Sequence, residues 1–117
     1  MLKFEELKVY NKALDCVDSV YDIILKFPVE ERFGLSDQLR RASVSIAANI
    51  AEGNGRYFKK EYIQFLHIAR SSTYECVALM QVSRKRGYVK EGIYEKIYNQ
   101  MIEITKMISG LINSLGE

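Results

Sequence analysis

Residues 43–53 read SVSIAANIAEG and place small side chains on several sides of one predicted helix. Apolar residues recur through and before this stretch at steps of three and four, which is the period of a helix buried along one face. They are Leu39, Ala42, Ile46 and Ile50. Small side chains let a neighbouring backbone come close, so larger side chains from another helix must fill the space. The stretch therefore predicts a helix in a closely packed bundle.

The first predicted helix, which ends near Phe27, has two adjacent apolar rows. One row is Leu7, Tyr10, Leu14, Val17, Tyr21 and Ile24, and the other is Val9, Ala13, Cys16, Val20, Ile23 and Phe27. Together they form a stripe wider than one partner helix covers. We therefore expect the flank that carries Val9 and Val20 to be covered by another copy of the chain.

Two further helices are predicted after residue 57. The third runs over about residues 58–85, with one row made of Tyr62, Phe65, Ala69, Ser72, Cys76, Leu79 and Ser83. The fourth has the most regular pattern in the chain, made of Tyr94, Ile97, Met101, Ile104, Ile108, Leu111 and Leu115. No strand pattern is found, so the fold class is all-α.

Helix boundaries are predicted from four residues. Pro28 ends the first helix, because the residue before a proline disfavours helical geometry. Ser36 is a good N-cap for the second helix, and Gly53 suits the left-handed position after its last residue, near Glu52. Gly87 closes the third helix. The short connections favour an antiparallel up-down-up-down four-helix bundle, roughly 25 to 40 Å long at 1.5 Å per residue.

Length and composition point to one ordinary globular domain over residues 1–117. Apolar residues make up 48% of the chain and charged residues 27%, with a net charge of +2. The charged N-terminus lacks the apolar core of a signal peptide, and no window approaches the roughly 20 apolar residues of a membrane span. We expect a cytoplasmic location and no membrane partner. Cys16 and Cys76 are interpreted as buried, reduced thiols, and His67 as a surface or interface residue, so no metal site is expected.

A polar flank accompanies the apolar row of the second helix. It is made of Arg41, Ser45, Asn49 and Glu52, and a tight turn after it would bring Ser72 and Glu75 opposite. In that register Asn49 faces Gln64, Phe65 and Ile68, while Arg41 faces Glu75. Three interpretations stay open: the flank sets helix register, it forms a ligand or catalytic site, or it makes a polar contact between subunits.

Basic residues gather at both ends of the predicted bundle. One end collects Lys26, Arg32, Arg40, Arg41, Arg84, Lys85, Arg86 and Lys90, and the other has Arg56, Lys59 and Lys60 beside Tyr57 and Phe58. Repeated in an oligomer, such a surface would hold phosphates by counterion release. We take Arg40, Arg56, Lys59, Lys60, Arg84, Lys85 and Arg86 as candidate nucleic-acid contacts. The alternative for residues 84–86 is that they complement a helix dipole and keep the surface soluble.

A set of residues in the first three predicted helices resembles a known family. The set is Phe27, Pro28, Glu31, Gly34, Leu35, Gln38, Arg41, Ala42, Ser45, Ile46, Asn49, Ile50, Ala51, Glu52, Gly53, Ala69, Arg70, Ser72 and Glu75. From about Phe4 to Tyr88 the chain resembles the four-helix bundle family of 23S rRNA intervening-sequence proteins. This resemblance implies a ring-like homopentamer without an established enzymatic activity. The accessory variability determinant of diversity-generating retroelements, a related protein, works beside a reverse transcriptase and binds nucleic acid.

These observations together predict a non-enzymatic binding or scaffold protein. Its expected partners are copies of itself and RNA or DNA, together with a nucleic-acid enzyme. No catalytic residue and no cofactor is predicted, since the chain has no P-loop, nucleophile elbow or paired-carboxylate site. The alternative is an assembly protein that acts only through protein contacts.

Overall fold

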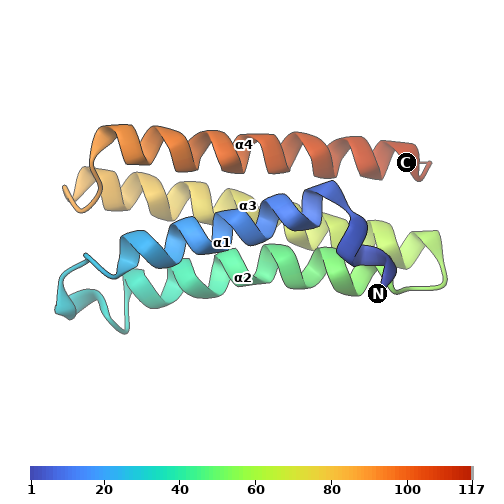
Figure 1. Ribbon diagram of the computed structural model, residues 1–117, viewed down its shortest axis with the longest axis horizontal. Helices are drawn as coiled ribbons and strands as arrows, with labels where there is room; N and C mark the ends of the chain where they lie inside the picture. The colour runs from blue at the N-terminus through green and yellow to red at the C-terminus, as the bar shows by residue number, and fades with distance from the viewer. Residues whose placement is uncertain (117) are drawn as a thin grey trace.

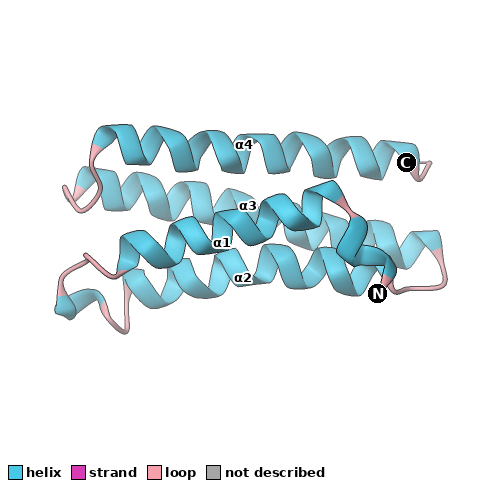
Figure 2. Cartoon of the chain, in the orientation of Figure 1, coloured by secondary structure: helices cyan, strands magenta, loops and turns pink. Residues whose placement is uncertain are grey.

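The computed structural model describes residues 1–116, which form four α-helices and two short 3-10 helices with no strand among them (Figure 2). The α-helices are α1 (Lys8–Ile24), α2 (Leu35–Asn54), α3 (Lys59–Lys85) and α4 (Glu91–Ser114). The 3-10 helices are η1 (Lys3–Glu6), before α1, and η2 (Val29–Glu31), in the α1–α2 connection. The all-α fold class is confirmed.

Each α-helix packs against two neighbours. Helix α1 contacts α2 and α4, and α3 likewise contacts α2 and α4. Figure 1 shows the α1–α2 and α3–α4 connections at one end of the molecule, and the α2–α3 connection with both termini at the other. The molecule measures 43 × 22 × 22 Å, slightly longer than expected. Its length follows from the 27 residues of α3, which rise about 40 Å.

The rows predicted for α2 and for most of α4 form the core. Leu39, Ala42, Ile46 and Ile50 are buried, as are Tyr94, Ile97, Met101, Ile104 and Ile108. In the last turn of α4 the buried residue is Ile112, while Leu111 and Leu115 are only partly buried. The buried row thus continues from Ile108 by a step of four residues to Ile112, where the prediction took a step of three to Leu111.

The prediction of which apolar row of α1 lies inside the single chain is wrong. The row predicted to lie against another copy, which includes Val9 and Val20, is buried inside the single chain. The other row is the partly open one, with Leu14 40% and Tyr21 42% exposed. The small side chains of Ala13 and Cys16 explain the choice, because they let α1 come close to its neighbours. Both rows have the same period, so the pattern could not distinguish them.

The row predicted for α3 is partly correct. Ala69, Ser72, Cys76 and Ser83 are buried, whereas Tyr62, Phe65 and Leu79 lie half-buried at its edge. Leu66, Thr73 and Met80 complete the buried face. Because α3 packs against both α2 and α4, its buried stripe is broader than one row.

Two predicted helix boundaries are wrong. Ser36 is not the N-cap of α2, because the helix starts at Leu35 with Gly34 before it, and Ser36 itself is buried. The side chain of Glu31 takes the capping role, since its Oε1 accepts a hydrogen bond from the Leu35 N–H at 3.3 Å. Gly53 is not the residue that ends α2 either: the helix continues through it to Asn54.

Gly53 instead allows close approach between α2 and α3. A Cβ atom at this position would lie 2.8 Å from the Cβ of Phe65 and 3.1 Å from Cδ1 of Tyr62. No side chain fits at that distance, so only glycine allows the two helices to pack this closely. Gly87, by contrast, has φ +79° just after α3, as predicted for a left-handed helix end.

Candidate functional site

The polar flank of α2 is joined to α3 by hydrogen bonds. The Oγ atoms of Ser45 and Ser72 lie 2.9 Å apart, across the contact between the two helices. The Asn49 Nδ2 donates to the backbone oxygen of Ser45 at 2.8 Å and to its Oγ at 3.0 Å. These partly buried groups therefore satisfy one another's hydrogen-bonding capacity within and between the two helices.

The register of α3 on α2 differs from the predicted one by about one helical turn. The tight turn expected after Glu52 would place Ser45 near Ile68, whereas Ser45 meets Ser72. The cause is the longer α2, whose Asn54 donates from Nδ2 to the Tyr62 hydroxyl at 3.1 Å. With α2 continuing past Gly53, the reversal of the chain comes later and α3 shifts along α2.

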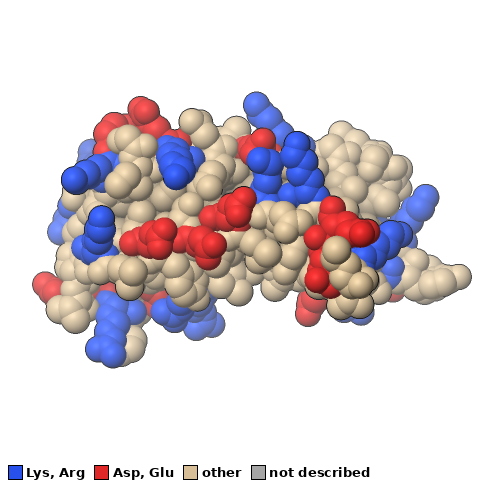
Figure 3. Space-filling model, in the orientation of Figure 1, with Lys and Arg blue, Asp and Glu red and all other residues tan. Residues whose placement is uncertain are grey.

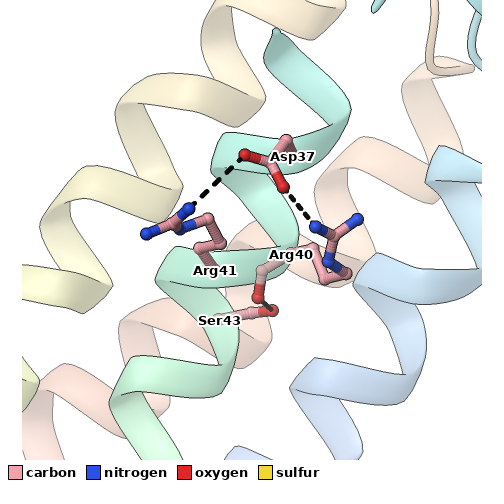
Figure 4. Close-up of polar contacts among 4 residues, drawn as sticks. All are labelled: Asp37, Arg40, Arg41 and Ser43. Carbon is pink, nitrogen blue, oxygen red and sulfur yellow. Dashed lines mark hydrogen bonds and ion pairs between the residues drawn. The ribbon is translucent and has the colours of Figure 1, made fainter. Parts of the chain in front are cut away.

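The expected contact between Arg41 and Glu75 is absent as an ion pair within residues 1–116. The Arg41 side chain is 77% exposed and lies 3.8 Å from the Asp37 carboxylate. Figure 4 shows Asp37 between Arg40 and Arg41, pairing with both guanidinium groups. Exposed pairs of this kind contribute about 0 to 1 kcal/mol, so Arg41 does not need a buried partner.

A shallow hollow nevertheless brings part of the predicted polar set together. It is lined by Asp37, Gln38, Arg41, Ala42, Ser45 and Glu75. Glu52 lies elsewhere, beside η1 and the α2–α3 connection, in a hollow that includes Lys3, Phe4 and Arg56. The six polar residues predicted as one network therefore separate into three groups. Ser45, Asn49 and Ser72 are hydrogen-bonded, Arg41 and Glu75 line the shallow hollow without an ion pair between them, and Glu52 lies apart.

The basic residues at the α3–α4 end are partly neutralised. The Arg84 guanidinium lies 3.3 Å from the Glu91 carboxylate and 3.9 Å from the centre of the Tyr94 ring. Arg40 is paired with Asp37. Lys85 and Arg86 are exposed, and neither takes part in an ion pair among the residues the structure describes. The contact of Arg84 with Tyr94 was not predicted, although the short α3–α4 connection was an available signal for it.

The opposite end combines cations with exposed aromatic rings. We call residues 56–60 the aromatic turn; it consists of Arg56, Tyr57, Phe58, Lys59 and Lys60. Tyr57 is 91% and Phe58 61% exposed, and their rings meet edge to face with centres 5.0 Å apart. Arg56 lies over the Phe65 ring at 4.6 Å and 3.9 Å from the Glu61 carboxylate, which fixes the start of the turn. Lys59 and Lys60, the last two residues of the aromatic turn, are exposed.

Acidic side chains line the exposed face of α1, between the two ends of the molecule. Figure 3 shows acidic side chains in a row over α1, while basic side chains lie toward both ends and above the middle of the same face with further acidic side chains near them. Exposed acids on α1 are Asp15, Asp18 and Asp22. The row was not singled out from the sequence, although its spacing of three and four residues was available there. An anionic polymer would therefore be disfavoured along α1.

No helix in the described part of the chain is both long and apolar enough to cross a membrane. Among the same residues, no group of three His, Cys, Asp or Glu side chains is arranged to hold a metal ion.

Comparisons with known proteins place the chain in a family. A family model described as 23S rRNA-intervening sequence protein matches residues 5–110, which extends the resemblance into α4. A solved structure of a protein with unknown function from the S23 ribosomal protein family of Bacteroides thetaiotaomicron VPI-5482 is similar, with 27% identity and a TM-score of 0.83. The similarity covers 89% of this chain and 97% of that one. No curated protein matches. The chain therefore belongs to the family of 23S rRNA-intervening sequence proteins.

Proposed function

We propose that this protein is a non-enzymatic, cytoplasmic binding protein that assembles with itself and holds single-stranded RNA or DNA at the aromatic turn. The observation that carries the proposal is the exposure of Tyr57 and Phe58 next to Arg56, Lys59 and Lys60. Tyr57 and Phe58 form a contiguous pair of exposed rings, whereas Phe33 at the opposite end, 87% exposed, is a single ring under Arg32. Of the candidate nucleic-acid residues, the proposal uses Arg56, Lys59 and Lys60 and leaves out Arg40, Arg84, Lys85 and Arg86 at the opposite end.

Single-stranded nucleic acids offer both kinds of contact that this turn presents. Unpaired bases stack on exposed aromatic rings, contributing about 1 to 3 kcal/mol per base, and lysine ammonium groups neutralise the phosphates. One turn with two rings holds only a short stretch of strand. A homopentamer, which the family resemblance implies, would repeat the turn around a ring and raise the effective affinity by multivalency.

The test is fluorescence anisotropy with a labelled 20-nucleotide oligo(U) and the matching oligo(dT), titrated at several salt concentrations. Tyr57→Ser with Phe58→Ser should weaken binding about tenfold or more without changing the salt slope, because stacking is lost and charge is kept. Lys59→Gln with Lys60→Gln should weaken binding and reduce the salt slope, because fewer counterions are released.

Two matched controls locate the site. Tyr74→Ser removes another exposed tyrosine, 60% exposed on α3 and away from both ends, and should leave affinity unchanged. Arg84→Ala with Arg86→Ala tests the opposite end. A loss of affinity only in the latter variant would move the site to the α3–α4 end. No binding by the wild type at low salt would reject a nucleic-acid function.

Self-assembly is the second part of the proposal and has its own support. Leu14 and Tyr21 leave an exposed apolar row on α1 that a second copy can cover. Sedimentation velocity at micromolar concentration should give a species larger than the 13.5 kDa chain, with a pentamer as the expected size. Leu14→Glu with Tyr21→Glu should shift it toward the monomer, while Val82→Glu on α3 serves as the control. A wild-type monomer would contradict the assembly.

The alternative function is an assembly protein that works only through protein contacts. It is supported by the same apolar row and would be favoured by an oligomer that binds neither oligonucleotide. A nucleic-acid enzyme is the protein partner expected under the main proposal, because both would act on the same strand.

A further inference from the structure

A cleft opens between the second half of α1 and the start of α4, away from the aromatic turn. Its volume is about 280 Å³, comparable with the smallest small-molecule sites. The lining residues are Ser19, Asp22, Ile23, Lys26, Tyr88, Val89, Lys90, Ile93, Lys96 and Ile97. Figure 1 shows α1 and α4 diverging toward the end of the molecule that carries the α3–α4 connection.

The floor of the cleft is aliphatic and its wall is held in place. Ile23, Val89 and Ile97 belong to the core, whereas Ile93 is 39% exposed and so gives the cleft an open apolar surface. Tyr88 donates from its hydroxyl to Glu31 Oε2 at 3.0 Å, and its ring centre lies 5.3 Å from that of Phe27. These contacts hold the Tyr88 side chain in place, so the cleft is formed without a ligand.

The rim of the cleft is cationic. Lys26, Lys90 and Lys96 line it against a single carboxylate, that of Asp22. All four side chains are exposed, and none of them takes part in an ion pair within residues 1–116. Three lysines thus surround an aliphatic floor while their ammonium groups are available to a ligand anion.

We propose that the α1–α4 cleft binds a small amphiphilic carboxylate, meaning a molecule with an aliphatic or aromatic body and one anionic head. The body lies on Ile93 and Ile97, and the carboxylate meets the lysine ammonium groups at the rim. The size of the cleft and its fixed wall favour such a ligand over a peptide helix. The proposal does not depend on nucleic-acid binding, because it uses other residues.

The probes are the fluorescent arylsulfonate 1-anilinonaphthalene-8-sulfonate and decanoate, used below the micellar concentration. Decanoate should displace the fluorophore, while decyltrimethylammonium, of similar chain length and opposite charge, should not. Lys26→Gln with Lys96→Gln should weaken decanoate binding about five- to twentyfold, since each exposed charge pair contributes up to about fivefold. Ile93→Glu should weaken it more than tenfold by placing a charge on the floor.

One variant should have the opposite effect. Asp22→Asn removes the only carboxylate on the rim and should tighten decanoate binding by about two- to fivefold. Lys106→Gln, an exposed lysine on α4 outside the cleft, should change nothing. All these positions are exposed, so thermal unfolding should confirm that each variant folds. Equal binding by every variant, or equal displacement by the cationic amphiphile, would overturn the proposal.

Discussion

Gly53→Ala should lower the free energy of unfolding by about 2 kcal/mol. The new Cβ would lie 2.8 Å from the Phe65 Cβ and 3.3 Å from the Tyr62 backbone oxygen, and neither atom can move by a simple side-chain rotation. Forcing α2 and α3 apart costs about 3 kcal/mol, the upper end of the usual range for overpacking, because neither contacting atom can give way, and replacing glycine in a helix offsets about 1 kcal/mol of this. The separation would also strain the hydrogen bond between Ser45 and Ser72.

Urea unfolding followed by circular dichroism measures this effect, with protein concentration held constant because the proposed assembly would add to stability. Gly110→Ala is the matched control. A Cβ at that position in α4 would meet nothing within 4 Å, so only helix propensity changes and the variant should gain about 0.5 to 1 kcal/mol. Similar shifts in both variants would show that Gly53 has no packing role.

The two thiols should react very slowly with Ellman's reagent in the folded protein. Burial raises the pKa of Cys16 to about 12, and burial together with the neighbouring Cys16 raises the pKa of Cys76 still further. At pH 8 the thiolate fraction of Cys16 falls about a thousandfold below that of a free thiol, and only the thiolate reacts. Both side chains are also fully inaccessible to the reagent.

The control for this measurement is Ala78→Cys, which places a thiol at an exposed position on α3. That thiol should react at once, and Cys16 and Cys76 only after denaturant is added. Rapid reaction of two thiols in native wild type would contradict the burial of Cys16 in α1 and of Cys76 in α3.

The raised pKa values also give stability a pH dependence. Below about pH 8 the thiols are almost fully protonated in both states, so they contribute almost no slope. Above pH 9 the unfolded thiols lose protons that the native ones keep up to about pH 12. Stability should therefore fall with rising pH in this window, by up to about 1.4 kcal/mol per thiol and pH unit.

The candidate site could be predicted only in part. Basic residues at each end follow from short connections, and Tyr57 and Phe58 stand beside Arg56 in the sequence itself. The pairing of each cation depends on partners from other helices, as the contacts of Arg84 with Glu91 and Tyr94 show. The sequence therefore could not indicate which end keeps more cations available to a ligand. The α1–α4 cleft was not anticipated, because its lining comes from α1, α4 and the α3–α4 connection, whose spacing is a property of packing.

The sequence by itself determined the number of helices, their approximate ends and the core rows of α2 and α4, because these depend on a local period of apolar residues. Tertiary structure decided which of the two rows of α1 is buried, how α3 is registered on α2 and why Gly53 is a glycine. These features depend on how closely two backbones approach, and that distance is set by side chains from both helices at once.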